Sequence, residues 1–182
     1  MILTGKEIEK RLGGDIIIEP YHPQQLNPNS YNLCLHSQLL VYTDELLDSA
    51  KKNPTREITI PDDGMVLEPG QLYLGRTAEY TETRGLVPMI LGRSSVGRLG
   101  ISVHLTSGFG DIGFCGCWTL QLTCIKKVRI YPNMKICQIF YHDILGEYEN
   151  YSSEKYQRSS RIMSSKLYEE LTPNPDCRSG NS

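Results

Sequence analysis

Residues 91–121 read LGRSSVGRLGISVHLTSGFGDIGFCGCWTLQ and carry the strongest pattern in the chain. The stretch has two arginines and two serines in one short segment, then a glycine-rich turn around a single aspartate, then a strand with one polar residue. Arginine and hydroxyl donors beside a tight turn are typical of a phosphate-binding site. We therefore expect a nucleoside triphosphate site here, built and closed by the rest of the chain.

The first half of the stretch predicts a short helix that faces an anion. Ser94 or Ser95 is a good N-cap, so the helix is expected to begin there. Its N-terminus would present free N–H groups and partial positive charge to phosphate oxygens. Ser94 and Arg98 share a helical face, and Arg93 lies just before the turn. The alternative is a capped surface helix with two solvated or ion-paired arginines.

The second half predicts a tight connection that approaches a ligand. Three glycines lie within residues 108–113, and such a stretch permits positive φ and close approach of the backbone. Asp111 on this connection can accept from a sugar hydroxyl or orient a water molecule. Phe109 can wall a base or fill the core. The alternative is a hairpin loop with an Asx turn.

The composition limits the classes of partner. The chain has 182 residues and a formal charge of −2, which gives no overall reason to expect nucleic acid or a membrane surface. No apolar run approaches the roughly 20 residues of a membrane span, and the N-terminus lacks a signal-peptide core. We expect a cytoplasmic protein with free cysteines. Zinc is disfavoured, because Cys115 and Cys117 lack a second pair at ligand spacing.

Short strands at near-regular spacing indicate an all-β fold, a sandwich or a distorted barrel. Thr4 and Glu7 form a capping box that predicts a short N-terminal helix. Residues 44–56 are charged and without pattern, which is typical of an exposed excursion. The expected strands are 16–19, two within 30–42 around a turn at 36–37, 57–60, 65–67, 71–76, 87–91, 101–104, 118–124, 128–131 and 135–142.

The combined motif, GRSSVGRLG followed by HLTSGFGDIGFCG, resembles the metal-independent dCTP deaminases. These belong to one superfamily with the trimeric dUTPases and with bifunctional enzymes that perform both steps. The similarity extends from ILTGKEIEKRL through NPNSYNLCL and LEPGQLYLGRT to KYQ in the tail. It implies a distorted jelly-roll-like β-barrel and a homotrimer with sites at subunit interfaces. It also implies a deoxynucleoside triphosphate, dCTP or dUTP, bound with Mg²⁺ and without zinc.

The resemblance also implies a division of the chain and a set of site residues. Residues 1–146 would form one dUTPase-like β domain, 147–170 a tail that closes over the nucleotide, and 171–182 a disordered end. Asp111 matches the aspartate that contacts the deoxyribose and, in the dUTPase branch, helps to activate water. Tyr148 or Tyr151 matches a tail tyrosine near the sugar. The other expected nucleotide-binding residues are Arg93, Ser94, Ser95, Arg98, Ser107, Phe109, Lys155 and Tyr156.

Gln121 departs from the family's pattern. The family has a glutamate in a T-L-E context, and this chain has Thr119-Leu120-Gln121. Deamination of cytosine needs a group that takes a proton from water and delivers it to the leaving amine. A glutamine amide can hydrogen-bond a base but cannot act as a general base at pH 7. We therefore expect slow deamination, or none, by the usual route.

Three functions stay open at this point. The first is dCTP deamination to dUTP and ammonia. The second is a dUTP or dCTP pyrophosphatase that uses Asp111 and magnesium, although no glycine-rich C-terminal motif of the trimeric dUTPases is present. The third is a nucleotide-binding regulator without turnover. His104 is a candidate replacement base. The interpretation that we favour is a structural one, in which His104 lines its strand and its polar atoms are hydrogen-bonded to partners.

Overall fold

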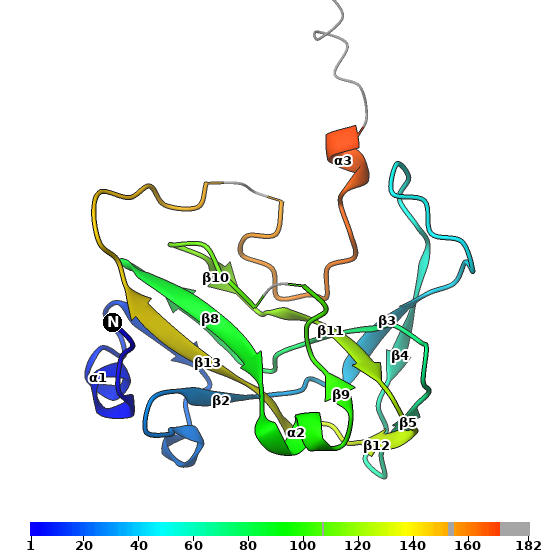
Figure 1. Cartoon of the computed structure of the whole chain (residues 1–182), viewed down its shortest axis with the longest axis horizontal. Coiled ribbons are helices and arrows are strands. Elements are labelled where there is room, and N and C mark those ends of the chain that lie inside the picture. The colour runs from blue at the N-terminus through cyan, green and yellow to red at the C-terminus, as the bar shows by residue number, and fades with distance from the viewer. Residues whose placement is uncertain (107, 153–154, 172–182) are drawn as a thin grey trace, which may run out of the picture.

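The computed structural model describes residues 1–106, 108–152 and 155–171, and Figure 1 shows mainly short strands. The helices are α1 (Gly5–Lys10), the 3₁₀ helix η1 (Pro23–Gln25), α2 (Ser94–Arg98) and α3 (Tyr168–Leu171). The strands are β1 (Ile16–Glu19), β2 (Tyr31–Cys34), β3 (Gln38–Tyr42), β4 (Thr55–Thr59), β5 (Met65–Leu67), β6 (Tyr73–Arg76), β7 (Tyr80–Thr83), β8 (Leu86–Gly92), β9 (Ile101–Ser102), β10 (Cys115–Gly116), β11 (Thr119–Cys124), β12 (Val128–Ile130) and β13 (Lys135–Asp143).

The strands form small open sheets. In spatial order these are β1-β7-β10, β4-β3-β6-β11-β9, β12-β5 and β2-β13-β8. The expectation of an all-β, jelly-roll-like fold with a short N-terminal helix is confirmed, and the sheets need not close into a complete barrel.

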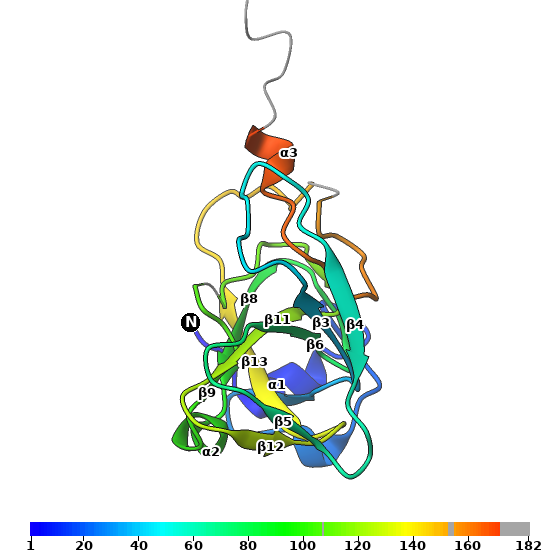
Figure 2. The same ribbon diagram turned by 90° about the vertical axis from the view of Figure 1, so that its right-hand side faces the viewer.

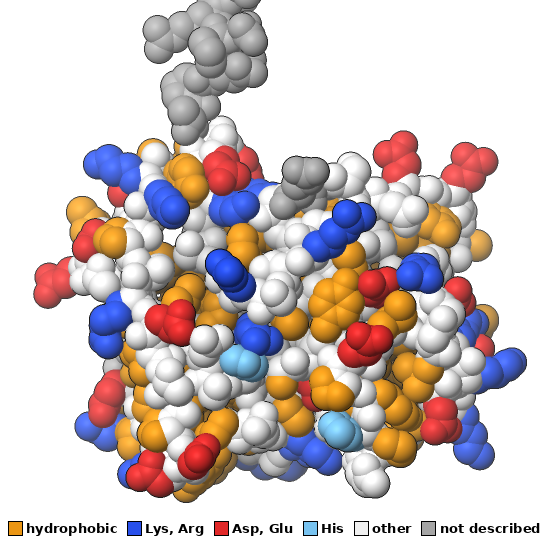
Figure 3. Space-filling model, turned by 180° about the vertical axis from the view of Figure 1, so that it is seen from behind, with side chains coloured by type: hydrophobic (Ala, Val, Ile, Leu, Met, Phe, Trp, Pro, Cys, Tyr) orange, Lys and Arg blue, Asp and Glu red, His pale blue; other side chains and the backbone are white. Residues whose placement is uncertain are grey.

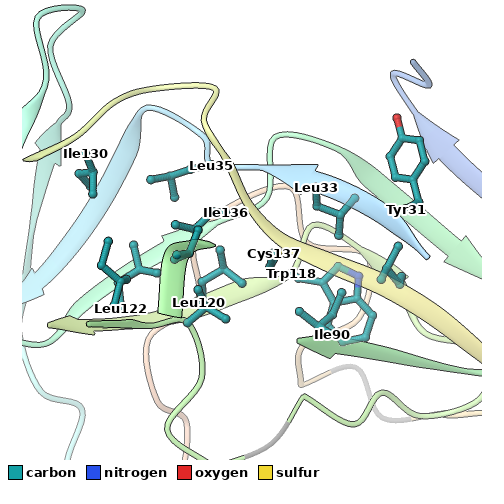
Figure 4. Close-up of a cluster of buried hydrophobic side chains, with 14 of the residues drawn as sticks. Tyr31, Leu33, Leu35, Ile90, Trp118, Leu120, Leu122, Ile130, Ile136 and Cys137 are labelled. Carbon is teal, nitrogen blue, oxygen red and sulfur yellow. The ribbon is translucent and has the colours of Figure 1, made fainter. Parts of the chain in front are cut away.

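The core lies between the sheet of β2, β13 and β8 and the sheet that contains β11. Leu33, Leu120 and Leu122 are fully buried, and Figure 4 shows the apolar side chains of these strands meeting in one cluster. Burial of one such leucine stabilises the fold by about 1.5–3 kcal/mol. Residues alternate faces along a strand, so the buried leucines of β11 leave Gln121 on the opposite face, where a site can form.

Two strands were not expected from the sequence, β7 and β10. The inward positions of β7 are Thr81 and Thr83, which are 0% and 2% exposed, so the strand has no apolar alternation. The hydroxyl of Thr81 instead accepts a hydrogen bond of 2.9 Å from the indole Nε1 of Trp118. Strand β4 also begins at Thr55, inside the segment that we expected to be an excursion.

Helix α1 begins as the capping box predicts. The Thr4 side chain accepts from the Glu7 backbone N–H at 3.3 Å. The Glu7 carboxylate does not complete the box, because it accepts a 2.8 Å bond from Arg11 Nε one turn later. The helix is therefore held by half of the box and by an i,i+4 ion pair.

The described part of the tail lies along β10 and β11 of its own chain. Its backbone contacts are Arg158 N to Cys115 O (2.8 Å), Cys117 N to Ser159 O (2.8 Å), Met163 N to Thr119 Oγ1 (3.2 Å) and Ser165 N to Tyr42 OH (3.1 Å). Helices α3 and α2 lie at opposite ends of the molecule in Figures 1 and 2. Of the end expected to be disordered, residues 172–182 lie outside the described residues.

The surface carries no single-sign field on the face that Figure 3 shows. Basic and acidic side chains are interspersed there, in agreement with the formal charge of −2. None of the helices in the described ranges is long and apolar enough to cross a membrane.

Candidate functional site

A cleft of about 450 Å³ lies beside α2. Its walls come from the end of β8, from α2 and from the segment after β9, and they include Gly92, Arg93, Ser94, Gly97, Val103 and His104. The cleft lining therefore contains one cation, three hydroxyls (Ser94, Ser102 and Thr106) and one imidazole, which are groups able to bind a polar anionic ligand.

Helix α2 confirms the expected helix, but the expected serine N-cap is wrong. Arg93 is the N-cap, with extended backbone at φ −84° and ψ 145°, and no side chain caps the helix. The backbone N–H groups of Val96 and Gly97 donate to the Arg93 carbonyl at 3.0 and 2.9 Å. Ser94 and Ser95 thus occupy the first turn with exposed side chains, because the helix begins one residue earlier than a serine cap requires.

The two arginines of the motif occupy different environments. Arg93 is partly buried, and its Nη1 donates to the carbonyl of Lys135 at 3.1 Å, which fixes the side chain against β13. Arg98 is exposed at the end of α2 and does not line the cleft, and neither does Ser95. Of the four arginines and serines expected to bind the triphosphate, Arg93 and Ser94 are therefore the two that line the cleft in a single chain.

His104, which lines this cleft, is paired with the side chain of Gln121. His104 Nδ1 lies 3.2 Å from Gln121 Oε1. The backbone supports the pair, since Gln121 N donates to Val103 O at 3.0 Å and Ser102 Oγ donates to His104 O at 2.9 Å. Burial lowers the pKa of His104, and the bond to Gln121 raises it by a smaller amount.

Asp111 and Phe109 lie in a neighbouring hollow of about 360 Å³ and not in the cleft. Tyr151 shares this hollow and is fixed by a 2.7 Å bond from its backbone N–H to Ile112 O. A β-bridge between Met89 and Phe109 places the hollow farther along β8. Asp111 is exposed, so within one chain it faces solvent.

The tail residues assigned by resemblance lie apart from the cleft. Lys155 forms an ion pair with Glu170, and Tyr156 OH accepts from Lys166 N at 3.0 Å. Tyr148 is 49% exposed and lines a third hollow at the end of β7. Ser107 lies outside the described residues.

Sequence reasoning considered His104 and Gln121 singly and missed their pairing. The two residues are 17 positions apart in the sequence. They are brought together by the pairing of β9 with β11, which consists of Ser102–Thr123 and Ile101–Cys124. The sequence signal that could have found the pair is alternation, which places Gln121 and Thr123 on one face of β11.

Comparisons with known proteins agree with one another. A family model described as dCTP deaminase-like matches residues 2–144. A Hathewaya histolytica protein named dCTP deaminase, dUMP-forming, is 59% identical over 171 residues, which cover 94% of this chain and 99% of that protein. A Leptospira biflexa protein of the same name is also 59% identical over 171 residues, 94% of this chain and 98% of that protein.

A solved structure shares the fold. The 2′-deoxycytidine 5′-triphosphate deaminase from Agrobacterium tumefaciens superposes with a TM-score of 0.60 at 18% identity. The match covers 77% of this chain and 47% of that chain, so this chain spans about half the length of that protein.

Proposed function

This chain belongs to the dCTP deaminase-like family, and from that premise we propose that it binds Mg·dCTP in the cleft beside α2 and converts it to dUMP, ammonia and pyrophosphate. The name dUMP-forming of relatives at 59% identity supports the product. The observation that carries the assignment to the cleft is its lining, which combines Arg93 and Ser94 with His104, the hydrogen-bond partner of Gln121.

The phosphate groups would lie against Arg93 and Ser94. Arg93 uses one of its five N–H donors on Lys135, which leaves others for phosphate oxygens in a fixed orientation. Ser94 adds an exposed hydroxyl in the first turn of α2. Ser95 and Arg98, exposed on the same short helix, would contact phosphates that extend beyond the cleft.

The base would lie toward Gln121 and His104. The Gln121 amide can hydrogen-bond the edge of a pyrimidine, but it has no proton to exchange at neutral pH. Conversion of dCTP to dUMP needs two hydrolytic steps, one at C4 of the base and one at the α-phosphate. The second step requires no ionisable group at position 121.

We further propose that the complete site forms between subunits of a homotrimer. Asp111, Phe109, Tyr148 and the tail segment around Lys155 lie outside the cleft of their own chain, so a neighbouring copy can supply them. Apolar side chains that are half or more exposed lie near the cleft, and such side chains are typical of an interface. They are Leu91, Leu99, Leu105 and Phe109. Light scattering that gives the mass of a monomer would contradict this assembly.

Magnesium belongs to the substrate in this proposal. Within residues 1–106, 108–152 and 155–171, no three His, Cys, Asp or Glu side chains gather as ligands. Mg²⁺ commonly keeps several waters and binds through substrate phosphates, so Arg93 and Ser94 would act on oxygens that the ion leaves free.

Product analysis tests the proposal. The purified protein is incubated with Mg·dCTP and, separately, with Mg·dUTP, and nucleotides are resolved by chromatography. The proposal expects dUMP from both substrates. A second candidate, a pyrophosphatase without deaminase activity, is favoured by Gln121 and expects dCMP from dCTP. Nucleotide bound without any product would instead indicate a regulator.

A further inference from the structure

The His104 ring is satisfied at one nitrogen and unsatisfied at the other. An amide oxygen can only accept a hydrogen bond, so the 3.2 Å contact with Gln121 Oε1 requires the proton on His104 Nδ1. The neutral ring then has its lone pair at Nε2. That Nε2 atom is buried and has no hydrogen-bond partner among the described residues. The interpretation of His104 as fully satisfied, which the sequence favoured, is therefore wrong.

A buried acceptor without a partner is uncommon and indicates a missing water or ligand group. His104 lines the same cleft as Arg93 and Ser94, so a nucleotide or its attacking water bound there would lie beside the ring. The carboxyamide of Gln121 holds the ring in one tautomer, as the amide of a Cys-His-Asn triad does. Because Gln121 is not ionisable, it leaves His104 Nε2 as the basic atom of the pair.

We propose that His104 Nε2 is the general base for deamination in this chain and that Gln121 is its positioning residue. This inference rests on the proposed function, because it assigns the first of the two hydrolytic steps. A carboxylate at position 121 is then not required for the reaction.

His104 Nε2 takes one proton from water while the water oxygen bonds to C4 of cytosine, and that proton passes to ring N3. The proton of the new C4 hydroxyl then moves to the amino group, the C4–N4 bond breaks, and ammonia leaves. The ring retains a C4 carbonyl and a protonated N3, which is uracil, and His104 returns to its neutral form.

The electrostatic surroundings favour a neutral, basic ring at pH 7. Burial lowers the pKa of His104 from its usual value, and the hydrogen bond that Nδ1 donates to Gln121 only partly opposes this. On β11, the same-face neighbours Thr119 and Thr123 are uncharged, and Arg93 is the charged side chain that lines the cleft. Only the unprotonated ring can accept a proton, so the rate should fall as pH decreases through this lowered pKa.

His104→Asn tests the proposal in the full-length protein with Mg·dCTP. The asparagine amide nitrogen occupies nearly the position of Nδ1, so it can still donate to Gln121, but it removes Nε2. The account expects kcat for ammonia release to fall by about 10²–10⁴-fold with little change in KM. It also expects the acid limb of the pH profile to disappear. His22→Asn, at an exposed histidine away from the cleft, is the matched control and should leave kcat unchanged.

Two further variants keep the test decisive. His104→Gln also lacks a base and should show the same loss if the asparagine variant fails to fold. Gln121→Glu supplies the carboxylate that the family pattern has at this position. The proposal is overturned if the unaltered protein releases no ammonia while Gln121→Glu does, or if His104→Asn retains kcat. Pyrophosphate release from Mg·dUTP and binding of dCTP report separately on the proposed function, which fails if the unaltered protein binds no nucleotide or forms no dUMP, whereas ammonia release by Gln121→Glu beside His104→Asn concerns the base alone.

Discussion

Arg93 Nη1 donates a 3.1 Å hydrogen bond to the carbonyl oxygen of Lys135, which ties the residue before α2 to the start of β13. The guanidinium is therefore oriented before any ligand arrives, and less conformational entropy is lost when it binds phosphate. We predict that Arg93→Ala raises the Kd of Mg·dCTP by about 10- to 150-fold, since a charge-assisted bond contributes about 1.5–3 kcal/mol. Isothermal titration measures it.

Arg56→Ala is the control for this prediction, because Arg56 is an exposed arginine on β4 and lies outside the cleft. Unchanged affinity in Arg93→Ala would remove the phosphate assignment. Arg98→Ala is expected to weaken binding as well, because the resemblance places Arg98 in the triphosphate segment.

Gly108 allows the loop beside the cleft to pack against β8. A Cβ atom at this position would lie 1.8 Å from the Ile90 carbonyl oxygen, where the backbone cannot yield without moving the strand. We predict that Gly108→Ala destabilises the fold by about 1–3 kcal/mol and reduces dCTP binding, as overpacking does. Gly14→Ala, whose Cβ would meet only Arg11 O at 3.5 Å, is the control. Equal melting temperatures for the two variants would refute this reasoning.

Glu79 is a buried carboxylate that accepts hydrogen bonds from two residues of the N-terminal part of the chain. It is 1% exposed and accepts 2.8 Å bonds from Gln25 Nε2 and from the Cys34 backbone N–H. Glu79→Ala leaves two buried donors unsatisfied, at about 1–3 kcal/mol each. We predict a marked loss of stability in urea.

A matched control exists on the surface. Glu57 accepts a 2.8 Å bond from the Gln38 amide at an exposed position, so Glu57→Ala should change stability by at most about 0.5 kcal/mol. A similar urea midpoint for Glu79→Ala and Glu57→Ala would show that the buried network contributes nothing.

The ion pair between Lys155 and Glu170 allows a test of whether the tail closes over the nucleotide. Lys155 is paired with Glu170, and this pair must open if Lys155 is to reach phosphates elsewhere. We predict that Glu170→Gln lowers the KM for Mg·dCTP by a few-fold at most, because exposed ion pairs are weak. Glu169→Gln is the neighbouring control. An increase in KM would show that the ion pair supports the closed tail and does not compete with it.

The sequence predicted the elements whose signals are local. Thr4 and Glu7 marked α1, and alternating leucines marked β11. It missed β7 because buried threonines occupy the inward positions of that strand, and one of them, Thr81, forms a hydrogen bond with Trp118, which is 37 residues away.

Only the part of the site with a local sequence signal was predictable. The arginine–serine motif is contiguous, so Arg93 and Ser94 could be proposed together. The pairing of His104 with Gln121 and the course of the tail along β11 depend on contacts between distant segments, which no local pattern encodes.

The most direct test of the account is the stoichiometry of a single turnover. Excess unaltered protein is mixed with Mg·dCTP, and ammonia and pyrophosphate are quantified in the same sample as dUMP. The account predicts one ammonia and one pyrophosphate for each dUMP formed. Pyrophosphate accompanied by dCMP, with no ammonia, would contradict it.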